Sequence, residues 1–267
     1  MNIAQQIQQG SYHDPFEWLG LHPLNEAQPA DGYIIRAFMP TADTVEVDNA
    51  GVMTRVDGSD LFELKLSAGQ KQQLPPHYSL SWTEKNAARV TTHNTVSPYS
   101  FLPQISQFDL DLFAAGKHLH VYRILGAHLK TIDGVDGCLF ALWAPNVKRV
   151  SVIGDFNAWH GLRHPMRSLG QSGVWELFIP GLQAEDAYKF ELLSQSGEIL
   201  HKTDPYARRM GLRPETTSKI TPAQSRAWQD EAWLQQRGQW QWLHQPVSVY
   251  EVHLGSWRKN KNGGFLS

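Results

Sequence analysis

The chain has 267 residues, of which 41% are hydrophobic and 19% are charged, and its 24 basic and 26 acidic residues leave a formal net charge of −2. This composition is typical of a globular protein with a sizeable core and excludes an intrinsically disordered chain. The near-neutral charge argues against nucleic-acid binding as the main task. No apolar run reaches the roughly 18 residues that cross a membrane.

The N-terminal segment from Met1 to Gly10 is polar and rich in glutamine, and Ile3, Ile7 and Gly10 predict a short helix there. This segment lacks the basic start and apolar stretch of a secretory signal. We therefore expect a cytoplasmic protein with no membrane and no nucleic acid among its partners. The single cysteine, Cys138, excludes an internal disulfide and a cysteine-rich zinc site.

Two halves of the chain carry the same motifs in the same order, at offsets between 105 and 113 residues. The motifs are Leu-Gly-x-His, a glycine-initiated strand ending before a proline, an alternating strand, and Pro-Tyr. In the first and second copy they occupy residues 19–22 and 125–128, 32–40 and 137–145, 61–66 and 174–179, and 98–99 and 205–206. An ordered repeat of this kind predicts two copies of one structural unit.

The strands of each copy alternate apolar and polar residues. Phe62, Leu64 and Leu66 fall on one face of their strand, whereas Glu63 and Lys65 fall on the other. Short alternating strands separated by Gly, Pro, Asp and Asn turns predict sandwiches of two antiparallel sheets. We expect a mostly β protein with two tandem β-sandwiches.

A helix is predicted between the two copies. Ser106 is a suitable N-cap, Phe108 and Leu112 lie one turn apart, and Gly116 is a helix stop. Nearby Asp109 is expected to belong to this capped turn. The helix would join the two sandwiches.

The second copy contains Gly-Asp-Phe-Asn-Ala-Trp at 154–159, with Trp-Ala-Pro before it at 143–145 and Tyr-Lys-Phe after it at 188–190. With these motifs the segment resembles carbohydrate-binding module family 48. The resemblance implies immunoglobulin-like β-sandwiches that accompany enzymes acting on α-glucans.

Residues 247–257 read Val-Ser-Val-Tyr-Glu-Val-His-Leu-Gly-Ser-Trp and resemble the first barrel strand of glycogen branching enzymes of glycoside hydrolase family 13. The tandem modules are similar to the N-terminal arm of bacterial members. A (β/α)8 barrel needs about 250 residues, far more than the segment from residue 247 to residue 267 provides. We therefore expect only the first strand of a truncated (β/α)8 barrel here. The family's catalytic carboxylates lie on later strands, and no catalytic residue is assigned to this chain.

A further helix is expected to start near Ser225 and to carry Trp228 and Trp233. Together these observations predict four segments. They are a first sandwich at 1–104, a linking helix at 105–120, a second sandwich at 121–225, and a linker with the orphan barrel strand at 226–267.

The resemblance implies an α-glucan as partner and places the carbohydrate-binding residues in the second copy. Trp159 would stack on glucose and Lys189 would donate to sugar hydroxyls. Asn157 would add a hydrogen bond or cap its turn, and Trp159 has the alternative role of an anchor in the core or between modules. Ile199-Leu200 stands where strong binders have a second aromatic residue, so we expect weak binding. The first copy lacks the tryptophan, which favours a structural or regulatory role.

No cofactor and no metal are expected. His118 with His120, and His160 with His164, lack the glutamate of a zinc-binding helix, and Asp155 is expected in a turn. The sequence thus predicts the N-terminal region of a branching enzyme of glycogen biosynthesis, inactive alone and able to self-associate through its exposed C-terminal strand. The alternatives are a free-standing glycogen-binding or regulatory module and the non-functional product of a disrupted gene.

Overall fold

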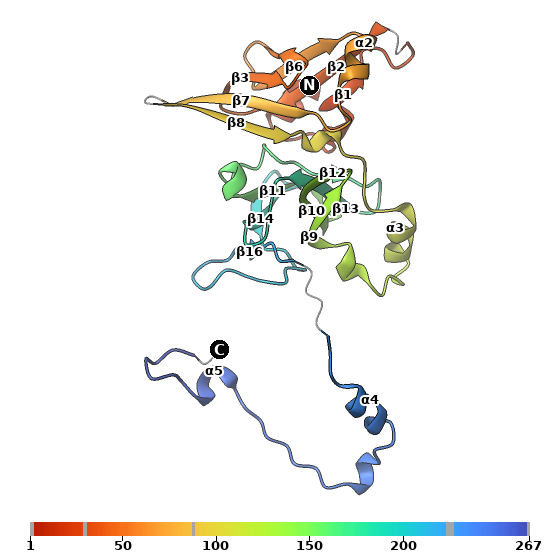
Figure 1. Ribbon diagram of the computed structural model, residues 1–267, viewed down its shortest axis with the longest axis vertical. Helices are drawn as coiled ribbons and strands as arrows, with labels where there is room; N and C mark the ends of the chain where they lie inside the picture. Colours follow the sequence, from red (N-terminus) through yellow and green to blue (C-terminus); the bar gives the residue numbers. More distant parts are fainter. Residues whose placement is uncertain (1–2, 29–30, 87–88, 223–226, 266–267) are drawn as a thin grey trace. The chain divides into compact units, whose positions relative to one another are not determined.

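The computed structural model describes residues 3–28, 31–86, 89–222 and 227–265. The chain divides into two compact units, Met1–Ala223 and Gln224–Ser267, which are described separately. The first unit contains four β-sheets and the second contains short helices (Figure 1). Within the described ranges, every helix is too short or too polar to span a lipid bilayer.

The first module of the larger unit is built from two antiparallel sheets that pack face to face. One sheet has the order β1 (Gly20–Pro23), β2 (Tyr33–Phe38), β6 (Leu61–Leu66) and β5 (Thr54–Arg55). The other has the order β4 (Gly51–Val52), β3 (Ala42–Val47), β7 (Ser79–Asn86) and β8 (Arg89–Val96). Their inner faces share one core, to which Ile35 and Phe62 contribute from the first sheet and Val45 and Leu80 from the second.

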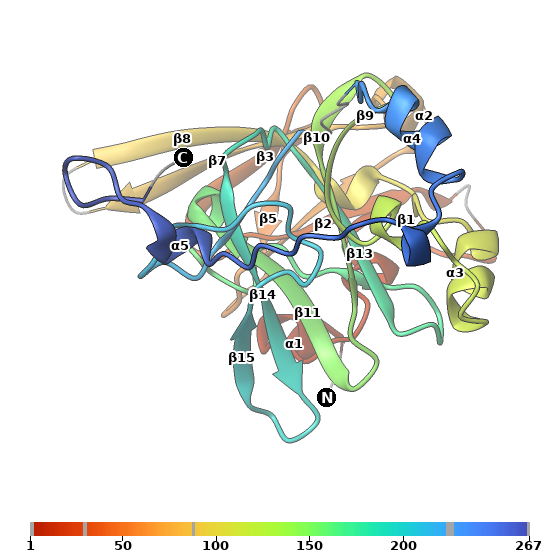
Figure 2. The ribbon, with the colours of Figure 1, turned by 90° about the horizontal axis from the view of Figure 1, so that it is seen from below.

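The second module repeats this plan. One sheet has the order β12 (Arg167–Ser168), β13 (Val174–Pro180), β10 (Val135–Trp143) and β9 (Gly126–Ile132). The other has β11 (Val147–Gly154), β14 (Ala187–Ser194) and β15 (Ile199–Lys202), which lie side by side in Figure 2. The short strand β16 (Ser218–Lys219) also pairs with β14. Phe140 and Leu177 of the first sheet pack against Val152 and Phe190 of the second.

The sequence repeat is therefore also a structural repeat. The strand order β1-β2-β6-β5 corresponds to β9-β10-β13-β12. In the first copy His22 Nε2 donates to the carbonyl of Leu19 at 2.9 Å, and in the second His128 Nε2 donates to the carbonyl of Leu125 at the same distance.

The glycine of each Leu-Gly-x-His motif has a backbone reason to be glycine. Gly20 and Gly126 have φ angles of 92° and 103°, in the left-handed region that other residues avoid. A Cβ at either position would lie 3.0 Å from Tyr99 or Tyr206, the tyrosines of the two Pro-Tyr motifs. The first and last motifs of each repeat thus lie against each other.

The short helix predicted between Met1 and Gly10 and the helix predicted between Ser106 and Gly116 are both present. Helix α1 (Ile3–Gln8) is followed by Gly10 at φ 64°. Helix α3 (Gln107–Ala114) begins at Ser106, whose hydroxyl accepts from the amide of Asp109 at 3.2 Å. The predicted apolar face was wrong, because Phe108 is 70% exposed and Leu110 is the buried residue.

Other short helices occupy connections. Helix α2 (Ala68–Gln73), which the sequence analysis did not predict, has a capping box formed by Ser67 and Gln70. Single 3-10 turns are η1 (Pro15–Glu17), η3 (Pro98–Ser100), η4 (Val121–Arg123) and η5 (Asp155–Asn157).

The segment that joins the modules packs on the outer face of the β9–β10–β13–β12 sheet. Ile105 and Leu110 cluster with Ala141 and Val174 of that sheet. On the same face, Glu176 is 1% exposed and accepts from the backbone amides of Gln104 at 3.0 Å and Ile105 at 2.8 Å. This connection is therefore bound to the second module by both apolar contacts and backbone hydrogen bonds.

The smaller unit has helix α4 (Glu231–Arg237), the turn η6 (Trp242–His244) and helix α5 (Leu254–Trp257). The predicted helix start near Ser225 lies outside the described residues, and Trp228 precedes α4 rather than belonging to it. The expected strand at the C-terminal end is not formed, since residues 246–253 have no regular secondary structure. A strand of a parallel barrel is stabilised by hydrogen bonds to neighbouring strands, and the described part of this unit provides no such neighbour.

Candidate functional site

The turn that follows β11 carries Trp159. Ala158 and Trp159 have φ angles of 54° and 58°, so both adopt the left-handed conformation. The amide of Trp159 donates to the carbonyl of Gly154 at 2.9 Å, and its indole Nε1 donates to Asp155 Oδ1 at 2.7 Å. These two bonds fix the ring in a half-exposed position at the end of the strand.

Asn157 lies beneath this turn and is 1% exposed. Its side-chain oxygen accepts from the amide of Gly154 at 3.0 Å, and its Nδ2 donates to the carbonyl of Val152 at 2.8 Å and to His164 Nδ1 at 2.9 Å. Both ends of the amide are therefore committed within the protein. This is the turn-capping role that the sequence left open for Asn157.

Lys189 lies in β14 between two fully buried aromatic residues, Tyr188 and Phe190. Alternation along the strand places its half-exposed side chain on the outer face of the sheet. Nζ donates to Thr216 Oγ1 at 2.7 Å. In the β11–β14 ladder Tyr188 is opposite Gly154, the residue to which Trp159 is bonded, so Lys189 and the Trp159 turn depend on the same pair of strands.

The turn between β14 and β15 carries no aromatic ring. Ile199 is 48% exposed at the start of β15 and is paired with Leu193. Stacking area in this region therefore comes from Trp159.

A buried ion pair between Arg149 and Glu191 also holds the turn that carries Trp159. Arg149 donates to Glu191 at 2.6 Å and to the carbonyl of Gly161 at 3.2 Å. Burial lowers the pKa of Arg149 and the carboxylate of Glu191 opposes that shift. Glu191 leaves no space for a side chain at Gly161. The two charged residues are 42 positions apart, so no local sequence pattern indicates the pair.

The same turn contacts the first module through Arg163. Its Nη2 donates to Glu84 Oε1 at 2.8 Å, to Thr41 Oγ1 at 2.6 Å and to the carbonyl of Pro40 at 3.1 Å. Burial raises the pKa of Glu84, but hydrogen bonds from Thr41 and Arg163 outweigh that effect and hold it below its usual value. The first module thus braces the turn that carries Trp159.

The histidine pairs noted in the sequence have other partners. His118 Nε2 is 3.0 Å from Asp109 Oδ1, and His164 is bonded to Asn157. Among the described residues, no group of three or more His, Cys, Asp or Glu side chains is arranged to hold a metal ion.

The larger unit is a tandem of two linked β-sandwich modules, the second with a tryptophan fixed in a surface turn. Residues 2–99 match the family of the alpha-1,4-glucan branching enzyme GlgB N-terminal domain, and residues 124–207 match carbohydrate-binding module 48, the isoamylase N-terminal domain. The chain therefore carries a GlgB-type N-terminal domain at residues 2–99, followed by a module of the carbohydrate-binding module 48 family at residues 124–207.

Three similar relatives are 1,4-alpha-glucan branching enzymes GlgB. The one from Thiobacillus denitrificans is 53% identical over 98% of this chain and 34% of its own length. Those from Hydrogenovibrio crunogenus and Methylococcus capsulatus are 46% and 48% identical, over 99% and 98% of this chain and 35% and 34% of their lengths. The chain thus spans about a third of these curated relatives. A solved structure of a pullulanase from Klebsiella pneumoniae complexed with maltotriose has a TM-score of 0.32 at 19% identity, over 76% of this chain and 20% of that one.

Proposed function

We propose that this chain supplies α-glucan binding to a cytoplasmic 1,4-α-glucan branching enzyme, with Trp159 as the stacking face and Lys189 as a donor to sugar hydroxyls. The observation that carries the proposal is the half-exposed indole of Trp159, fixed by Gly154 and Asp155. A flat ring that is already ordered loses little conformational entropy when a sugar stacks on it. Asn157 contributes indirectly, because its buried side chain holds the turn that carries Trp159.

The proposed affinity is low. One aromatic platform contributes about 1–3 kcal/mol, by analogy with stacking on other planar ligands. Without a second ring near Ile199, this corresponds to a dissociation constant on the order of millimolar or weaker. Such an affinity suits a site that acts beside other contacts on a long polymer.

The proposed division of the chain follows the four predicted segments. Residues 1–104 form the bracing module, 105–120 the connection, 121–225 the glucan-binding module, and 226–267 a linker with the segment that would become the first barrel strand. The exposed apolar side chains Val247 and Val249 suit a strand that is buried on both faces when neighbouring strands are present.

The branching reaction itself is proposed for the longer enzyme. It cleaves an α-1,4 bond and transfers the freed chain to a 6-hydroxyl, which resembles retaining glycosidase chemistry and requires a carboxylate nucleophile and a carboxylic acid. Among the described residues every pairing between named strands is antiparallel, so no (β/α)8 barrel is present to hold those groups. We expect the 267-residue chain to leave amylose unbranched. Loss of iodine colour together with new 1,6 linkages would contradict this.

Affinity electrophoresis in gels that contain glycogen tests the binding proposal. The chain should be slightly retarded, and Trp159→Ala should remove most of the retardation. Trp143→Ala is the matched control, because Trp143 is 52% exposed at the end of β10 in the same module. If both variants are retarded as strongly as the parent chain, the glucan contact lies elsewhere.

A further inference from the structure

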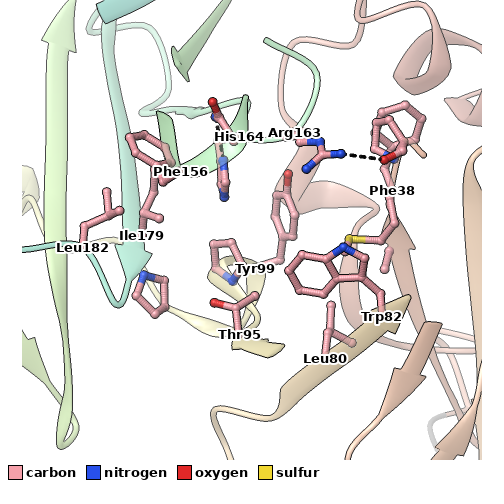
Figure 3. A pocket seen from close by; sticks show the side chains of 16 residues that line it. Phe38, Leu80, Trp82, Thr95, Tyr99, Phe156, Arg163, His164, Ile179 and Leu182 are labelled. Carbon is pink, nitrogen blue, oxygen red and sulfur yellow. Dashed lines mark hydrogen bonds between the residues drawn. The ribbon is translucent and has the colours of Figure 1, made fainter. Parts of the chain in front are cut away.

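A cavity of about 130 Å³ lies between the two modules, and the 155–164 turn contributes to its lining. Figure 3 shows Phe156 and Ile179 of the second module on one wall, and Trp82 and Leu80 of the first module on the other. Tyr99, from the segment that joins the modules, lies between these walls. The cavity therefore has aromatic walls from both modules.

Trp82, on the wall from the first module, is held in place by its neighbours. His93 stacks on Trp82 with ring centroids 5.1 Å apart and an interplanar angle of 19°, so one face of the indole is covered. The indole Nε1 is within 3.4 Å of Glu84 Oε1, which fixes the direction of the ring edge. Trp82 also packs against the core of the first module and contributes to the lining of the cavity.

The polar atoms at the cavity rim are also fixed. Because Asn157 Nδ2 donates to His164 Nδ1, the neutral imidazole carries its proton on Nε2, and Figure 3 shows this ring pointing into the cavity. Arg163 Nε is buried without a hydrogen-bond partner among the described residues. The hydroxyl groups of Tyr99 and Thr95 also belong to lining residues.

We propose that this cavity binds one glucosyl ring of an α-glucan, with Trp82 and Phe156 against the apolar faces of the ring and His164 Nε2 donating to a hydroxyl. This inference rests on the proposed α-glucan specificity of the chain but concerns a site separate from Trp159. A pyranose combines apolar C–H faces with a polar rim, which matches two aromatic walls and a few directed polar groups.

The walls come from different modules, and this has a thermodynamic consequence. A ligand that contacts Trp82 and Phe156 together binds only while the modules are docked. By mass action it therefore stabilises the docked arrangement. The bracing contact of Arg163 with Glu84 lies beside the same cavity, so occupancy would also favour the turn geometry that presents Trp159.

Indole N–H resonances of the full ¹⁵N-labelled chain test the proposal, since Trp82 and Trp159 can be assigned with Trp82→Leu and Trp159→Ala. The probes are methyl α-glucoside and maltotriose. We expect the Trp82 signal to shift saturably with a dissociation constant in the millimolar range. Thr95→Phe, which fills the cavity, should weaken the Trp82 response at least about tenfold, whereas Trp159→Ala should leave it intact.

The outcomes separate this inference from the proposed function. If the Trp159 signal shifts and the Trp82 signal does not, the cavity site is contradicted and the surface site at Trp159 is supported. If neither signal shifts, both sites are contradicted. A Trp82 response to phenol but not to either sugar would show an apolar site and overturn the glucosyl assignment. If Thr95→Phe alters the circular dichroism spectrum, Phe156→Leu replaces it as the test variant. Phe156→Leu should weaken the Trp82 response, and an unchanged response would contradict the proposal.

Discussion

Arg163 in the second module donates to Glu84 in the first at 2.8 Å, across 79 residues of sequence. The same guanidinium nitrogen reaches Thr41 and the carbonyl of Pro40, so one side chain binds a strand and a turn of the neighbouring module. Because Arg163 belongs to the turn that begins after β11, the position of Trp159 depends on residues outside its own sandwich.

Arg163→Met should destabilise the docked modules by about 1–2 kcal/mol, since Glu84 and Thr41 lose a charged donor. Denaturant midpoints of the full chain measure this effect, and Arg163→Lys should recover part of it. The control is Arg209→Met, which removes the exposed ion pair with Glu185 and should change stability little. Equal effects of the two methionine variants would show that Arg163 has no special bracing role.

Glu176 should be among the most sensitive positions of the connection between modules. Glu176→Ala removes the acceptor of the Gln104 and Ile105 amides and leaves Arg167 buried without its carboxylate, so we expect a loss of about 3–5 kcal/mol. Glu176→Gln keeps one acceptor oxygen and should lose less. Amide hydrogen exchange at Gln104 and Ile105 reports directly on these bonds, and unchanged protection in the alanine variant would argue against them.

His164 should make the stability of the protein depend on pH. Burial lowers its pKa to about 4, and Arg163 acts in the same direction. The folded state therefore binds fewer protons than the unfolded state between about pH 6.5 and 4, and its stability falls as the pH falls through this window, by about 3 kcal/mol from this group.

The comparison of the parent chain with His164→Gln isolates that contribution, because the glutamine does not titrate and its carbonyl can accept from Asn157. Buried acids such as Asp204, whose pKa is raised by burial, act in both proteins and cancel. The unfolding free energy of the parent chain should fall by about 3 kcal/mol relative to that of the variant as the pH falls from 7 to 4. Parallel pH profiles would contradict the assignment.

The C-terminal segment should cause concentration-dependent self-association. Val247, Val249 and Tyr250 are 66%, 87% and 75% exposed, and their backbone is not paired in a sheet. Exposed apolar residues with free backbone groups favour pairing between copies. Light scattering should show growth with concentration for the full chain and none for a chain cut near Arg237. A monomeric full chain at high concentration would refute the prediction.

Much of the fold could be predicted from the sequence because its signals are local or repeated. The cap at Ser106 depends on residues within a few positions of each other. The alternation in β6 and β13 is set by the pleat of a single strand. The two copies strengthen the prediction of each other's fold, because the same order of motifs at a nearly constant offset predicts the same strand order in both.

Local patterns also misled at two places. A helix pattern that pairs Phe108 with Leu112 does not reveal which face meets the neighbouring sheet, and Leu110 proved to be the buried residue. The β-rich sequence at 247–252 describes a strand only when partner strands are present. Hydrogen-bond partners, rather than intrinsic propensity, decide whether such a segment forms a sheet.

The sequence by itself determined the mostly β architecture and the repeat, and its resemblance to known modules predicted Trp159 and Lys189 as contacts to glucan. The tertiary structure decided that Asn157 is buried, that Glu191 and Arg149 form an ion pair, and that Arg163 and Trp82 meet around one cavity. The physical reason is distance along the chain. Arg149 and Glu191 are 42 positions apart and meet because β11 and β14 are neighbours in one sheet. Arg163 and Trp82 meet only because the two sandwiches pack against each other, whereas Asn157 is buried by the fold of its own turn.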